Sequence, residues 1–152
     1  MRVVSLTPER FDDFIALVCA LADYEKLDRP SADAIERLRG DAFSEHPRYW
    51  AFLALSDTEE AIGYAICLET YSSFLAKPTM YLEDIFVRED ARTFGAGSAL
   101  FSTVVELGRS RGCGRVDWQV LDWNTLARDF YRARGAEEMS EWMLYRITLE
   151  GQ

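Results

Sequence analysis

The residues with the clearest chemical potential lie in one continuous stretch of the chain, residues 81–98. Two adjacent carboxylates, Glu83 and Asp84, lie near its start, and residues 92–97 follow with the pattern Arg-x-x-Gly-x-Gly. Glycines let a backbone turn tightly and approach a ligand without obstruction by a Cβ atom. The N–H groups at the start of a following helix favour phosphate oxygens. The stretch therefore predicts a phosphate-binding loop beside a possible proton acceptor, although an ordinary strand-to-helix connection also contains such glycines.

Other phosphate-binding patterns and most metal sites are excluded by the residues present. A P-loop requires a lysine after its last glycine, and no lysine follows Gly97. A dinucleotide fingerprint requires a third glycine where this chain has Leu100. The only histidine is His46, and the three cysteines form no Cys-x-x-Cys pair. We therefore expect no metal site and no disulfide framework.

The apolar spacing along the chain predicts the elements that must position these residues. We expect strands at 3–6, 49–55, 61–71, 80–87, 115–120 and 142–149, and helices at 8–24, from Ser31 to Gly40, after Gly97, and at 125–134. Strands and helices alternate only after residue 80, where a parallel crossover is the natural connection. The expected fold is therefore α/β (α+β mixed), with a central mixed, mostly antiparallel sheet flanked by helices.

The strand over residues 80–87 carries both carboxylates. Adjacent residues of a strand point to opposite faces of the sheet, whereas a β-bulge inserts an extra residue and disturbs this alternation. Glu83 and Asp84 can therefore face the same side only if a bulge intervenes.

Composition limits the partners of the chain. It has 152 residues, 26 acidic and 17 basic, which gives a formal net charge of −9. Such a charge argues against nucleic-acid binding, which needs a basic face, and is compatible with a cationic small molecule. No apolar run approaches the ~20 residues of a membrane-spanning helix, and the N-terminus lacks an apolar signal core. We expect a cytoplasmic protein without a membrane partner.

Several motifs occur here in the same order as in a known family. They are residues 21–25 (Leu-Ala-Asp-Tyr-Glu), 81–84 (Tyr-Leu-Glu-Asp), the loop 92–97, 123–124 (Trp-Asn) and 130–136 (Phe-Tyr-Arg-Ala-Arg-Gly-Ala). In this the chain resembles the Gcn5-related N-acetyltransferase (GNAT) superfamily, and within it the diamine (spermidine/spermine-type) acetyltransferases. The resemblance implies one domain over residues 1–152, acetyl-CoA as co-substrate, and a homodimer. It implies direct transfer of acetyl to a primary amine of a small cationic metabolite in a ternary complex.

The resemblance also implies roles for individual residues. Glu83 would accept the proton of the amine, directly or through water, and Tyr131 would protonate the departing thiolate. Acetyl-CoA would contact Ile85, Phe86, Val87, Arg92, Thr93, Phe94, Gly95, Ala96, Gly97, Ser98, Asn124 and Tyr131. The acceptor would contact Tyr24, Glu25, Glu83, Asp84, Trp118 and Gln119. Simpler interpretations remain: an arginine-paired surface carboxylate for Glu83, a core aromatic for Tyr24 or Tyr131, and a helix cap for Asn124.

One departure from the family pattern concerns the substrate. Diamine acetyltransferases carry an acidic residue and a tryptophan shortly before the fourth strand, where this chain has Ser72-Ser73-Phe74. Loss of that carboxylate weakens recognition of a distant second ammonium, so a smaller or lysine-like amine competes with a polyamine. Two alternatives stay open: a GNAT enzyme for an aminoglycoside or protein lysine, and a sensor that binds acyl-CoA without transferring it.

Overall fold

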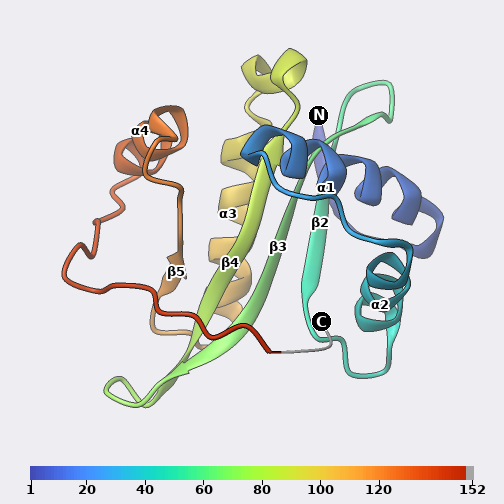
Figure 1. The fold of residues 1–152 in the computed structure, drawn as a ribbon. Coiled ribbons are helices and arrows are strands. Elements are labelled where there is room, and N and C mark those ends of the chain that lie inside the picture. The colour runs from blue at the N-terminus through green and yellow to red at the C-terminus, as the bar shows by residue number, and fades with distance from the viewer. Residues whose placement is uncertain (150–152) are drawn as a thin grey trace. The chain divides into compact units, whose positions relative to one another are not determined.

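The computed structural model describes residues 1–149, apart from the side chain of Thr93. The chain divides into two units, Met1–Gln119 and Val120–Gln152, and each is described by itself. The described residues of the first unit form a five-stranded sheet (Figure 1). Its strands, in spatial order, are β1 (Arg2–Ser5), β2 (Trp50–Leu55), β3 (Ala61–Ser72), β4 (Lys77–Val87) and β5 (Val116–Trp118). Strands β1 to β4 pair antiparallel and β5 joins β4 in parallel, so the expected mixed, mostly antiparallel sheet is confirmed.

Helices cover both faces of this sheet (Figure 1). Helices α1 (Phe11–Glu25) and α2 (Ala32–Phe43) lie on one face, and α3 (Ala96–Ser110) lies on the other. The alternation of side chains along the strands gives each face its own core. Phe11, Phe14, Leu53, Tyr64 and Ile66 belong to the α1 side, whereas Ala54, Cys67, Met80, Leu82, Leu100 and Val104 belong to the α3 side.

The boundaries of the helices follow local chemistry. Ser31 begins α2 as predicted, because its hydroxyl accepts a hydrogen bond from the Ala34 N–H at 3.1 Å. The helix continues past the expected end at Gly40 to Phe43. The Phe43 ring lies 6.0 Å from that of Phe11, edge to face, and this packing outweighs the low helix propensity of one glycine. Two short 3-10 helices, η1 (Pro8–Arg10) and η2 (Glu89–Phe94), precede α1 and α3.

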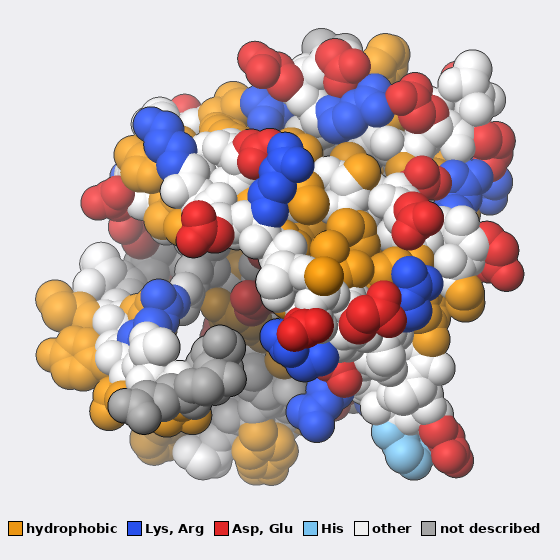
Figure 2. All heavy atoms as spheres, turned by 45° about the vertical axis from the view of Figure 1, so that its right-hand side comes forward, with side chains coloured by type: hydrophobic (Ala, Val, Ile, Leu, Met, Phe, Trp, Pro, Cys, Tyr) orange, Lys and Arg blue, Asp and Glu red, His pale blue; other side chains and the backbone are white. Residues whose placement is uncertain are grey.

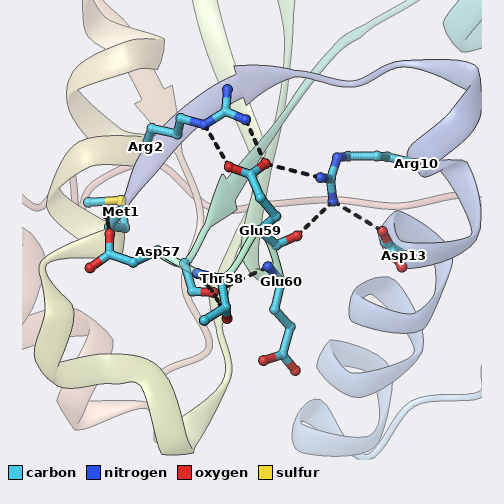
Figure 3. Close-up of polar contacts among 9 residues, drawn as sticks. Met1, Arg2, Arg10, Asp13, Asp57, Thr58, Glu59 and Glu60 are labelled. Carbon is cyan, nitrogen blue, oxygen red and sulfur yellow. Dashed lines mark hydrogen bonds and ion pairs between the residues drawn. The ribbon is translucent and has the colours of Figure 1, made fainter.

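Polar contacts hold the β2–β3 turn against the chain start and α1 (Figure 3). The Glu59 carboxylate accepts hydrogen bonds from Arg2 at 2.6 Å and from Arg10 at 3.4 Å, and Arg10 also bonds the Glu59 carbonyl oxygen. Glu60, next in the turn, pairs with Arg88 at 2.7 Å. Exposed ion pairs of this kind stabilise by about 0–1 kcal/mol each, so their main effect is to fix the turn.

The second unit contains α4 (Thr125–Ala133), close to the predicted helix 125–134. The strand predicted at 142–149 is wrong for the described residues, which are irregular there. Apolar alternation is insufficient for a strand, because the backbone needs a hydrogen-bonded neighbour and this unit contains none through Leu149. The strand predicted at 115–120 is shortened to Val116–Trp118, the three residues that pair with β4. Across the described residues, every helix lacks the length and apolar run of a membrane span.

Gly63 of β3 provides a test of this packing. A Cβ atom there would lie 2.8 Å from the backbone oxygen of Phe86 and 3.1 Å from Cγ2 of Val87, whereas a Cβ at Gly40 meets no atom within 4 Å. We predict that Gly63→Ala lowers the free energy of unfolding by about 1–3 kcal/mol through overpacking. Gly40→Ala should raise it by about 0.5–1 kcal/mol by reducing backbone freedom. Urea denaturation measures both, and changes of the same sign would contradict the close β3–β4 approach.

Candidate active site

Strand β4 contains a bulge at the two carboxylates. Asp84 lies opposite Ile66, and Leu82 lies opposite Cys67, so Glu83 is an extra residue without an opposite partner on β3. Leu82 and Ile85, on either side of the carboxylates, both pack on the α3 side. The bulge therefore places Glu83 and Asp84 together on the α1 side, the arrangement that the sequence made conditional on a bulge.

Asp84 is a half-buried carboxylate with one hydrogen-bond donor. The Tyr64 hydroxyl, which comes from the neighbouring strand β3, donates to its Oδ2 at 3.1 Å. Burial above all, together with the negative charges of Glu83 and Glu25, raises the pKa of Asp84 to about 6, although the Tyr64 hydrogen bond acts to lower it. The group is thus held in an environment that disfavours its charged form.

The C-terminal end of α1 adds a third carboxylate. Glu25 is the last residue of the helix, which ends where Lys26 adopts a left-handed conformation with φ 58°. Burial raises the pKa of Glu25, and the carbonyl end of a helix is itself negative. Neither Glu25, Glu83 nor Asp84 forms an ion pair with a lysine or arginine of the described residues. We call these three residues the acidic corner.

Tyr24 and Arg92 link α1 to the loop before α3. The Tyr24 ring lies 6.5 Å from that of Phe86, and the Arg92 guanidinium lies 5.3 Å above the centre of the Tyr24 ring. The Arg92 Nε–H also donates to the Val87 carbonyl oxygen at 3.1 Å. Arg92 therefore orders the turn, and its predicted contact with acetyl-CoA stays a prediction.

Within the first unit, the edge of β4 that faces β5 is unpaired beyond the bulge. Strand β5 pairs only with Met80–Leu82, and the part of this edge after Leu82 pairs with no other described strand of that unit. The Arg88 N–H donates to Ile62 of β3. Because donors alternate along a strand, the N–H groups of Ile85 and Val87 point the other way, toward the open edge. This edge offers backbone hydrogen bonds to an extended ligand.

The glycine loop follows directly. Gly95 has φ 76°, a conformation that favours glycine, and α3 begins at Ala96. Gly97 thus lies inside the first helical turn instead of before it. No side chain at Gly95 caps the helix, and the first bond within it is that from Ala99 N–H to the Gly95 oxygen. The helix itself supplies no partner to its earlier N–H groups, the arrangement typical of anion binding.

Of the two residues predicted at the end of β5, Trp118 does not lie with the acidic corner, whereas the predicted role of Gln119 stays a prediction. The Trp118 ring packs edge to face against Phe101 of α3, 5.4 Å away, and so belongs to the opposite face of the sheet. Gln119 is exposed.

Tyr64 was missed by sequence reasoning because it lies in an apolar strand pattern. The signal available was a phenol amid buried residues, since a buried hydroxyl requires a partner.

The second unit holds two further predicted residues, Asn124 and Tyr131. The Asn124 Oδ1 accepts from the Ala127 N–H at 3.2 Å, which confirms its interpretation as the cap of α4. Tyr131 is half-buried on the same helix, with its ring 5.5 Å from that of Phe130. Its proposed chemical role stays a prediction.

Known proteins are similar to this chain in sequence and in fold. Residues 12–136 match the Acetyltransferase (GNAT) family. A thialysine N-epsilon-acetyltransferase of Bos taurus is 35% identical over 148 residues, covering 91% of this chain and 86% of that protein. An L-ornithine N5-acetyltransferase of Arabidopsis thaliana is 44% identical over 86 residues, covering 57% of this chain and 38% of its own length.

A solved structure agrees in fold. An aminoglycoside N-acetyltransferase in complex with CoA superposes with a TM-score of 0.73 at 23% identity, covering 97% of this chain and 99% of that one. At this identity the likeness concerns the fold alone. The family match runs across the boundary between the two units, from α1 to the end of α4. The chain therefore belongs to the GNAT family of N-acetyltransferases.

Proposed function

We propose that this chain transfers the acetyl group of acetyl-CoA to a primary amine of a small cationic metabolite of the thialysine or ornithine type. One observation carries the proposal: the bulge in β4 gathers Glu83 and Asp84 on the face where α1 contributes Glu25. Three carboxylates that form no ion pair with a basic residue of the described part of the chain make a site that a cation would complete. The relatives are named for thialysine and ornithine, and both of these compounds carry a positively charged amine.

The reaction requires a neutral amine. An alkylammonium with a pKa near 10.4 must lose a proton, which costs about 4–5 kcal/mol at pH 7. Glu83 is exposed and forms no ion pair with an arginine of the described residues, so it is available as the acceptor, directly or through water. Asp84 and Glu25, which are less exposed, hold positive charge elsewhere on the substrate.

The backbone beside this corner suits acetyl-CoA, which supplies the acetyl group on a thioester. The N–H groups of Ile85 and Val87 at the open edge of β4 are suited to the amides of the pantetheine arm. Gly95 and the uncapped start of α3 are suited to the pyrophosphate. The ordinary apolar side chains of 85–87 fit this role, because the recognition uses main-chain atoms.

In this proposal Tyr131 supplies the proton that the departing thiolate needs. We assign this role because the helix of Tyr131 resembles the corresponding helix of the family. Glu83 first takes the proton of the ammonium, directly or through water, and releases it to solvent. The neutral amine nitrogen then forms a bond to the thioester carbon and gives its second proton to Glu83. The carbon–sulfur bond breaks, and Tyr131 donates a proton to the sulfur and regains one from solvent. A phenol stays protonated at pH 7 and can serve as this donor.

We further propose that residues 1–152 act as one domain. The cytoplasmic location and the homodimer stay predictions.

The region before β4 favours a compact acceptor over a polyamine. Ser72 is buried and its hydroxyl accepts from the Leu75 N–H at 3.2 Å, so it serves the β3–β4 turn, while Phe74 is fully exposed. On the face in Figure 2, acidic and basic side chains are interspersed instead of gathered into one patch. The proposal therefore uses the acidic corner as its cation-binding site.

Substitutions at the two proton-transfer residues test the function. With acetyl-CoA and saturating thialysine, Glu83→Gln and Tyr131→Phe should each lower kcat by about 10²–10³-fold, because each removes a general acid or base. Thiol release measures turnover, and the KM for acetyl-CoA should change little. Glu36→Gln on α2 and Tyr49→Phe before β2 are matched controls that should keep full activity. Full activity of both site variants would contradict the mechanism even in a correctly assigned fold.

Asp84 links function to stability. Its raised pKa means that the folded state binds the proton more tightly than the unfolded state does, so its contribution to stability is present below about pH 4 and is lost as the pH rises through about 6. Asp84→Asn should therefore raise the free energy of unfolding by about 1–3 kcal/mol at pH 8, with no gain at low pH, while it weakens amine binding.

A matched substitution has the opposite sign. The pKa of Asp23 is lowered by its hydrogen bond from Arg29, so Asp23→Asn should lower stability at pH 8 and not raise it. Thermal unfolding across this pH range measures both variants. A loss of stability in Asp84→Asn at pH 8 would contradict the burial argument.

A further inference from the structure

Tyr64 occupies an unusual position for a polar residue. It lies near the start of β3, fully buried, and pairs with Phe86 of β4. Its ring contacts that of Phe14 edge to face at 5.5 Å and lies 6.4 Å from that of Phe86. The ring is therefore packed between aromatic side chains, while its hydroxyl reaches the acidic corner and bonds the Asp84 carboxylate. A buried hydroxyl at this place must have a fixed acceptor.

We propose that Tyr64 is a positioning residue of the acceptor site: its hydroxyl holds one oxygen of Asp84 and leaves the other for an ammonium group of the substrate. This inference rests on the proposed function and adds to it a residue that touches neither reacting atom. The hydrogen bond reaches Oδ2 at 3.1 Å, from a ring that two aromatic neighbours prevent from moving. Fixing the carboxylate before binding lowers the entropy that binding must remove.

The charges around Asp84 define what Tyr64 does there. Glu25 faces it from α1, Glu83 and Tyr81 adjoin it on β4, and Tyr64 faces it from β3. Burial and the two glutamates raise the pKa of Asp84, and the Tyr64 hydrogen bond opposes them. Without that hydroxyl, Asp84 would take up a proton at a higher pH and lose the charge that binds the cation.

Tyr64→Phe separates this role from simple packing, because it keeps the ring and removes only the hydroxyl. We expect the KM for thialysine to rise about tenfold at pH 7, while kcat at saturating amine and the KM for acetyl-CoA are retained. The acid limb of kcat/KM for the amine should move to higher pH by about 0.5–1 unit, following the Asp84 carboxyl.

Tyr49→Phe is the matched control. The Tyr49 hydroxyl donates to the Leu38 carbonyl oxygen at 2.7 Å, away from the acidic corner. Its removal tests the general effect of losing a partly buried phenol bond and should leave the acid limb in place. In an Asp84→Asn background, Tyr64→Phe should have no further effect on the KM for thialysine, because the two residues act through one contact.

Carbon-13 NMR titration of the Asp84 carboxyl keeps the inference separate from the proposed function. In the protein without substrate, Tyr64→Phe should raise the pH at which this carboxyl titrates. An unchanged titration, or an unchanged acid limb and KM in Tyr64→Phe, would overturn the positioning role. If the wild type showed no amine-dependent turnover while the titration shifted as expected, the proposed function would fail and the Tyr64–Asp84 coupling would stand.

Discussion

In a strictly alternating strand, Glu83 and Asp84 would face opposite sides of the sheet, one toward α1 and the other toward α3. The extra residue in β4 prevents this, and the consequences extend along the strand. Leu82 and Ile85 both remain in the α3-side core, while the carboxylates share the α1 side. Pairing with β5 also ends at Leu82, so one irregularity coincides with both the acidic corner and the open backbone edge.

The acidic corner has a thermodynamic cost that the rest of the fold offsets. Asp84 is partly desolvated beside Glu83 and Glu25, and each of these contacts disfavours its charge. Packing alone would favour an amide or an apolar residue at this position. A charged group that lowers the stability of the folded state is typical of functional sites. The counter-charge is therefore expected from a ligand, and the ordered aromatic contacts of Tyr64 and Tyr24 keep the corner in one shape.

The elements that the sequence predicted well are those specified by local periodicity. Strands β2 to β4 contribute alternate side chains to the two cores, helices α1 and α3 bury one apolar stripe each, and Ser31 and Asn124 form the caps that their types indicate. Features that depend on pairing with another strand were harder to predict from the sequence. The strand at 142–149 has the right composition but no paired neighbour in its described unit, and the position of the bulge depends on the register with β3.

The candidate site shows the same difference between features that local sequence specifies and features that require the fold. Glu83, Asp84 and the glycine loop are recognisable from residue types and spacing, whereas the Tyr64–Asp84 hydrogen bond joins residues twenty positions apart and requires the fold. The motif predicts that Arg92 contacts acetyl-CoA, whereas its contacts with the Val87 carbonyl and the Tyr24 ring become visible only in the fold. Trp118 fits a pocket edge by its position in the motif order, yet its ring packs with Phe101 on the other face.

A crystal structure of the protein with CoA and thialysine tests the central claim, that the acidic corner receives the cationic acceptor. The account predicts a substrate nitrogen within about 2.7–3.2 Å of a Glu83 or Asp84 carboxylate oxygen, with the Tyr64–Asp84 hydrogen bond retained. It also predicts the reactive amine on the Glu83 side. A complex in which thialysine binds elsewhere, and neither carboxylate contacts it, would contradict the account.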